Sequence, residues 1–75
     1  MTTSLDKMPA GKTGRVSSVD GGQGFRRRLE ALGIVPGTEV TKVSSQLMRG
    51  PAIVRVGMTQ VAIGYGMARK ITVEL

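Results

Sequence analysis

The chain contains the stretch Gly24-Phe-Arg-Arg-Arg-Leu-Glu-Ala-Leu-Gly-Ile-Val-Pro-Gly-Thr-Glu-Val40, which is more informative about the fold than any other part of the sequence. Within it, Phe25, Leu29 and Leu32 lie at positions i, i+4 and i+7. This spacing puts the three side chains on one apolar stripe along two helical turns. The stretch therefore predicts a short helix that begins near Gly24 and buries that stripe.

The end of this helix and the turn after it are marked by glycine and proline. Gly33 follows the last apolar residue of the stripe, where a left-handed glycine ends many helices, and Ile34 can fold back onto the last turn. Pro36 and Gly37 form a pair that fixes φ at one position and permits a positive φ at the next. We expect Gly33 to stop the helix, and Pro36 and Gly37 to turn the chain into a strand.

The rest of the chain is predicted to form short strands. They are expected at Lys12–Val19, Thr38–Leu47, Ala52–Val56, Val61–Ile63 and Ile71–Leu75, with turns at 48–51 and 57–59 and a loop at 64–69. Val16 and Val19 are three residues apart, as are Val40 and Val43, so burying both members of each pair requires a bulge or bend. About five strands and one short helix predict a mainly β fold, a small and strongly bent barrel.

The chain's 75 residues are enough for one domain. We expect residues 1–9 to be a flexible leader that ends at Pro9, and residues 10–75 to form the domain. The start of the chain lacks the apolar core of a signal peptide, and no run approaches the ~20 apolar residues of a membrane span. These features predict a cytoplasmic protein.

The net charge of +6 favours anionic partners: nucleic acid, lipid head groups or an acidic protein surface. Phe25 and Tyr65 are the only aromatic residues in the sequence, and Phe25 belongs to the buried stripe. Readers of single-stranded RNA or DNA stack bases on several exposed rings. The composition therefore argues against that class of partner.

Three consecutive arginines, Arg26, Arg27 and Arg28, stand in what we expect to be the first turn of the helix. Cations there oppose the positive end of the helix dipole, and no Ser, Thr, Asp or Asn stands at the expected cap. This unfavourable placement makes the three arginines the first candidates for partner binding, followed by Arg49 and Arg55. The alternative is a solvated face on which Arg28 lays its stem against the stripe.

Metal binding and catalysis find little support. The chain has neither Cys nor His. Its acidic residues are scattered over different elements: Asp6, Asp20, Glu30, Glu39 and Glu74. Metal sites need several converging ligands, and an active site needs an acid–base pair, an activated nucleophile or a cofactor loop. We expect no enzyme, no cofactor and no tight metal site.

Four pieces of the sequence resemble the ferrous iron transport protein A (FeoA) family. They are Gly14–Val16, the Arg26–Val40 block, Gly50-Pro51 and Met67–Val73. The resemblance implies an SH3-like barrel that serves bacterial ferrous iron uptake as a small cytoplasmic accessory. It implies binding to, or regulation of, the membrane ferrous iron permease and its GTP-binding domain, with contact to the anionic inner face of the membrane as a further option.

A second reading, from a different class, is a basic SH3-like barrel that binds RNA. Such a protein would show steep salt dependence in its nucleic-acid binding. The shortage of aromatic residues and the Arg26–Val40 block favour the accessory role. The sequence leaves the oligomeric state and the partner-binding face open.

Overall fold

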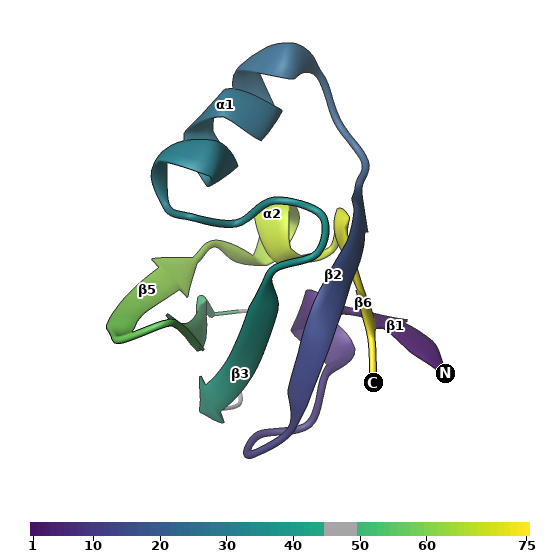
Figure 1. Cartoon of the computed structure of the whole chain (residues 1–75), viewed down its shortest axis with the longest axis vertical. Coiled ribbons are helices and arrows are strands. Elements are labelled where there is room, and N and C mark those ends of the chain that lie inside the picture. The colour runs from purple at the N-terminus through teal and green to yellow at the C-terminus, as the bar shows by residue number, and fades with distance from the viewer. Residues whose placement is uncertain (45–49) are drawn as a thin grey trace.

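The computed structural model describes residues 1–44 and 50–75. Six short strands, two α-helices and one 3₁₀ turn follow one another along the chain (Figure 1). They are β1 (Thr2–Ser4), η1 (Leu5–Lys7), β2 (Thr13–Val19), α1 (Gln23–Ala31), β3 (Glu39–Ser44), β4 (Ala52–Val56), β5 (Thr59–Ile63), α2 (Tyr65–Ala68) and β6 (Ile71–Glu74).

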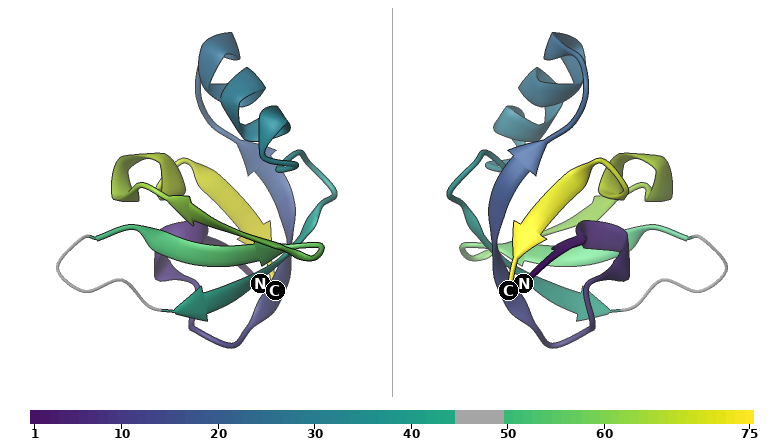
Figure 2. Two further views of the ribbon diagram at one scale, coloured as in Figure 1. Left: turned by 90° about the vertical axis from the view of Figure 1, so that its left-hand side faces the viewer. Right: turned by 90° about the vertical axis from the view of Figure 1, so that its right-hand side faces the viewer.

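All six strands belong to one antiparallel sheet in the order β1-β6-β2-β3-β4-β5. The sheet curls around an apolar core, and α1 stands at one end of the barrel (Figure 2). The prediction of a mainly β, strongly bent barrel is confirmed, with β1 as a strand that the sequence did not indicate. α2 is one short helical turn in the segment 64–69 that was expected to be a loop.

The predicted bulge in the first strand is present. The register of β2 against β6 shifts between Val16 and Ser18, and both Val16 and Val19 are buried as a result. In β3 the register also shifts, between Lys42 and Ser44. Val43 is nevertheless 36% exposed, so the expected burial of Val43 is wrong. Strict alternation along β3 turns Lys42 inward instead, and that side chain is 1% exposed.

The N-terminal residues are part of the barrel, which corrects the expectation of a flexible leader at residues 1–9. Thr2–Ser4 pairs with β6, and Leu5 and Met8 are buried in the core. Main-chain pairing and apolar burial both oppose disorder at a terminus. Residues 1–9 contain only three separated apolar residues, Met1, Leu5 and Met8, in a polar context, too few to define a periodic pattern.

Lys42 holds this segment in place through its ammonium group. Its Nζ donates to the backbone carbonyl oxygens of Leu5 at 3.0 Å, Asp6 at 3.3 Å and Met8 at 2.9 Å. An ammonium group has three donors, so every one of them is satisfied at a site where an unpaired polar group would be costly. Burial lowers the pKa of Lys42 below its ordinary value, and the negative charge of Asp6 opposes that shift.

The helix stop follows the predicted pattern. The N–H of Ile34 donates to the carbonyl of Leu29 at 2.8 Å, and the N–H of Gly33 donates to that of Glu30 at 2.9 Å. These two bonds are the Schellman arrangement, and Gly33 has the left-handed φ of +83° that it requires. Ile34 is buried, which confirms its place as the apolar lid of the last turn.

The predicted turn at Pro36 and Gly37 is also confirmed. The N–H of Thr38 donates to the carbonyl of Val35 at 3.0 Å, which closes a four-residue turn around the pair. Gly37 has a φ of +95°, so the turn uses the conformational freedom of glycine at its third position. This turn delivers the chain from α1 into β3.

One residue of the predicted apolar stripe, Leu32, does not lie on the buried face of α1. Leu29 is fully buried and Phe25 packs half-buried against the core, whereas Leu32 is 36% exposed. Leu32 is the C-terminal cap residue of α1, with a ψ near 0°. The chain leaves the helix there, so the helical spacing no longer sets the direction of its side chain.

β4 and β5, the third and fourth of the predicted strands, bury the faces that the sequence predicts. Ala52, Val54 and Ile63 are fully buried, and β4 and β5 join through the predicted tight hairpin at 57–59. The first half of the turn predicted at 48–51, residues 48 and 49, lies outside the described residues. No helix in the described part of the chain is long and apolar enough to cross a membrane.

Candidate functional site

α1 carries the three candidate arginines on three different flanks. Successive helical residues are rotated by about 100°, so Arg27 lies opposite the inward-facing pair Phe25 and Leu29. Arg26 and Arg28 flank that pair on either side. All three arginines are exposed. The arginines therefore surround the solvent side of the helix rather than forming one compact patch.

The start of α1 differs from the expected one. The helix begins at Gln23 with Gly22 as its cap, and the N–H of Arg26 already donates to the Gly22 carbonyl at 3.1 Å. The expectation that the three arginines occupy the first turn is therefore wrong: Arg26 follows that turn, and Arg28 lies in the last one. The helix dipole acts mainly on the terminal turns, so it penalises these arginines less than the sequence implied.

The first turn of α1 has no compensating group of its own. It contains no acidic residue, and no side chain caps the N-terminal N–H groups. The helix therefore presents a positive end together with three cationic side chains. An acidic surface is the complement of such an element.

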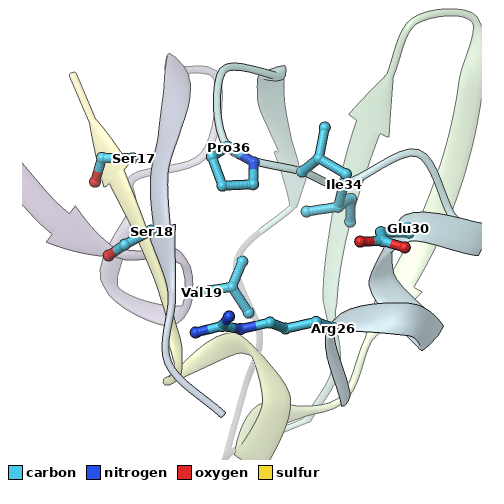
Figure 3. A pocket seen from close by; sticks show the side chains of 8 residues that line it. Ser17, Ser18, Val19, Arg26, Glu30, Ile34 and Pro36 are labelled. Atoms are coloured by element: carbon cyan, nitrogen blue, oxygen red, sulfur yellow. The ribbon is translucent and has the colours of Figure 1, made fainter. Parts of the chain in front are cut away.

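A hollow of about 300 Å³ lies between α1, β2 and the connection from α1 to β3 (Figure 3). It is lined by Ser17, Ser18, Val19, Arg26, Glu30, Ile34, Val35 and Pro36. The Arg26 side chain extends from α1 toward β2, and the side chains of Ser17 and Ser18 point away to the other side of their strand. The hollow thus joins an apolar floor to one cation and one carboxylate.

Two further cations lie against the only aromatic rings of the chain. The Nζ of Lys70 is 5.6 Å from the centre of the Phe25 ring, and the guanidinium of Arg69 is 5.8 Å from that of Tyr65. These are cation–π distances. Sequence reasoning missed both residues, because Lys70 reaches Phe25 only through the fold. With a cation over each ring, neither ring is a free platform for stacking a nucleic-acid base.

The structure does not place the other two predicted site residues, Arg49 and Arg55, beside α1 or the hollow. Arg55 is exposed on β4, where it pairs in register with Thr41 on one side and Gln60 on the other. It does not line the hollow beside α1. Arg49 lies outside the described residues. The partner-binding role of all five arginines stays a prediction.

No metal site can be assembled from the residues that the structure describes. Among them, no three acidic side chains come together in a group that could hold an ion. The N-terminal amine lies 3.7 Å from the carboxylate of Glu74 on the exposed surface. Neither the hollow nor α1 gathers the ligands that Fe(II) or Zn(II) prefers.

Comparison with known proteins places this chain in a family. The model of the FeoA domain matches residues 3–75. A protein of Methanocaldococcus jannaschii that carries the name Fe(2+) transport protein A is 37% identical over 59 residues, which cover 79% of this chain and 70% of that protein.

Solved structures agree in fold and in sequence. A crystal structure of an iron uptake regulatory protein, FeoA, superposes with a TM-score of 0.92 at 34% identity and covers 99% of this chain and 97% of its own. Stenotrophomonas maltophilia FeoA, solved with zinc and described as a procaryotic SH3 domain protein, gives 0.81 at 30% identity, over 96% and 89% of the two chains. This chain therefore belongs to the FeoA family and has the SH3-like fold of that family.

Proposed function

We propose that this protein is a cytosolic accessory of ferrous iron uptake that binds the GTP-binding domain of the membrane ferrous iron permease through α1. Membership of the FeoA family supports the link to ferrous iron transport. The observation that supports α1 as the binding element is the charge of its solvent-facing side. Arg26, Arg27 and Arg28 are all exposed, and the first turn of the helix contains no acidic residue.

Electrostatic attraction should determine the association rate and the salt dependence of this contact. A net charge of +6 steers the protein toward an acidic partner surface, and the attraction weakens as salt screens it over a Debye length of about 8 Å at physiological ionic strength. The apolar floor beside Arg26, formed by Val19 and Ile34, supplies an uncharged contact next to the cation. Association should therefore be fast and salt-dependent, with specificity set by the hollow.

Ferrous iron uptake in cells tests this proposal. The test variant replaces Arg26 and Arg27 by Ser, and leaves Arg28 in place because it stands beside the buried stripe. The matched control replaces Lys7 and Lys12 by Ser, which removes the same two charges from exposed positions away from α1. We expect the α1 variant to lose most of its support of uptake and the control to keep it. Equal uptake by both variants at equal protein level would refute the role of α1.

The RNA-binding alternative makes a different prediction for the same variants. Nucleic-acid affinity falls with the number of phosphates that are neutralised, so both double variants would weaken RNA binding to a similar extent. The cations over Phe25 and Tyr65 reduce the stacking surface that RNA readers use. We therefore favour the protein partner.

A further inference from the structure

β5 forms one edge of the sheet. It is last in the strand order of the described residues, and it pairs there with β4 alone. Within the described part of the chain, no backbone hydrogen bond outside the β4–β5 pair involves residues 59–63. The outer side of β5 therefore offers main-chain groups that no strand among residues 1–44 and 50–75 satisfies.

The direction of these groups follows from the ladder at β3. The N–H of Lys42 donates to the carbonyl of Lys12 at 2.9 Å, and its carbonyl accepts from the N–H of Gly11 at 2.8 Å. Both partners precede β2, so Lys42 directs its backbone toward the β2 side. Backbone groups alternate in direction along an antiparallel strand, and Thr41 therefore faces β4, where it pairs with Arg55.

The same alternation continues to the edge. The backbone N–H and C=O of Arg55 point toward β3. Those of its two neighbours on β4 therefore point toward β5 and bond to their register partners Thr59 and Val61. The residues in between, Gln60 and Ala62, then direct their N–H and C=O groups away from β4. Both residues are exposed. The free edge thus presents two donors and two acceptors in the spacing that an added strand requires.

This edge lacks the protection that edge strands ordinarily carry. Its sequence, Thr59-Gln-Val-Ala-Ile63, contains neither a charge nor a proline. Natural sheets block their edges with such residues, or keep the edge strand very short. The opposite edge follows that rule, since β1 has only three residues. An open edge of five uncharged residues is suited to accepting a strand.

The charges nearby indicate what kind of strand fits. Residues 50–73, which include β4 and β5, contain no Asp or Glu, and their three cationic residues, Arg55, Arg69 and Lys70, are all exposed. Arg55 stands exposed beside Gln60 in register, and Val61 is half-buried on the inner face of β5. An added strand would place alternate side chains beside Gln60 and Val61, and the long side chain of Arg55, one strand further in, can reach across Gln60 toward it. Acidic residues complement Arg55, and apolar residues extend the surface at Val61.

We propose that the outer edge of β5 binds an extended, acidic segment of a partner protein as a seventh strand of the sheet. Main-chain bonds to Gln60 and Ala62 provide the affinity, and the alternation of acidic and apolar side chains provides the selectivity. A second copy of this chain fits less well, because each copy brings a charge of +6 to the contact. The proposal rests on β5 and does not depend on what α1 binds.

A synthetic eight-residue peptide of alternating Val and Glu is the probe, and its counterpart of alternating Val and Lys is the control. Amide hydrogen exchange of the full chain is followed residue by residue with each peptide. We expect the Glu peptide to slow exchange at Gln60 and Ala62, and the Lys peptide to leave both unchanged. Absence of protection at these two amides under saturating Glu peptide would overturn the proposal.

Two variants at one position separate the edge from the fold. Ala62→Pro removes the outward N–H and leaves the bonds to β4 intact, because proline is tolerated where an edge N–H faces solvent. Ala62→Val keeps the N–H. We expect the proline variant to lower affinity for the Glu peptide about tenfold and the valine variant to keep it. Equal affinity of the two folded variants would overturn the proposal, as would a dimer of the wild-type chain that only the proline variant dissociates.

Discussion

The ammonium group of Lys42 donates to the backbone carbonyl of Met8 at 2.9 Å and thereby joins β3 to the N-terminal segment from inside the barrel. The same group also bonds the carbonyls of Leu5 and Asp6. A buried cation is ordinarily destabilising, but here three main-chain acceptors replace its water. This arrangement explains how the segment from Thr2 to Met8 packs onto the core without a long strand of its own.

Replacing Lys42 by Met tests this arrangement. The variant keeps the length of the side chain but leaves the buried carbonyl of Met8 without a donor and that of Leu5 with only the N–H of Met8, 3.3 Å away. A buried acceptor without a donor costs about 1–3 kcal/mol. We expect a loss of roughly 2–4 kcal/mol in the free energy of unfolding by denaturant. Lys12→Met, at an exposed position, should change little. A Lys42→Met variant as stable as wild type would show that desolvation of the charge cancels its three bonds.

The lowered pKa of Lys42 gives a second test, in alkaline solution. In the unfolded chain this amine keeps its proton up to a pH of about 10.4, whereas in the folded chain it releases the proton at lower pH. Across that window the unfolded state binds more protons, so the free energy of unfolding rises with pH.

Comparing wild type with Lys42→Met isolates this effect, because the other titrating groups cancel. We expect the stability advantage of wild type over the variant to grow as pH rises through the window. A constant advantage would mean an ordinary pKa for Lys42. A shrinking one would mean that the three carbonyl acceptors raise that pKa.

The contrast between Leu29 and Leu32 tests the packing of α1. Leu29 is fully buried beneath the helix, so Leu29→Ala should cost about 2–5 kcal/mol by emptying a core site. Leu32→Ala removes the same atoms from a residue that is 36% exposed, and should cost well under half of that. Thermal unfolding of both variants measures the difference. Equal melting temperatures would show that α1 does not pack on the barrel through Leu29.

Substitutions of glycine within α1 and in the turn after it should change the stability of the protein in opposite directions. Gly33 and Gly37 have positive φ, where a β-carbon costs about 1–2 kcal/mol, so Gly33→Ala and Gly37→Val should both destabilise the protein. Gly24 lies inside the helix, with open space around the position of an added β-carbon. Gly24→Ala should therefore stabilise the protein by up to about 1 kcal/mol. Denaturation midpoints of the three variants check the signs, and a stabilising Gly33→Ala would contradict the helix stop.

Local chemistry made much of the fold predictable. Gly33 and Pro36-Gly37 act within a few residues of themselves, and the alternation of Ala52 and Val54 is a direct property of a strand. The bulge in β2 was predictable for the same reason, because Val16 and Val19 cannot share a face of a regular strand. Each of these features is fixed by near neighbours in the sequence.

Three of the features that sequence reasoning missed depend on distant partners. A lysine in a strand ordinarily points to solvent, and only the carbonyls of the N-terminal turn make burial of Lys42 favourable. Lys70 meets Phe25 for the same kind of reason, because β6 runs beside the end of β2. The free edge of β5 is likewise a property of the strand order, which no local pattern encodes.

We propose that α1 binds the cytosolic GTP-binding domain of the ferrous iron permease. The most direct test of this proposal is the affinity of the purified domain, from the same organism, for three proteins at physiological ionic strength: wild type, the Arg26→Ser/Arg27→Ser variant and the Lys7→Ser/Lys12→Ser variant. Exposed ion pairs contribute up to about 1 kcal/mol each, so we expect the α1 variant to bind about tenfold more weakly, with a ceiling of roughly 30-fold for two pairs, and the control to bind nearly as well as wild type. Equal affinities for all three proteins would contradict the proposal.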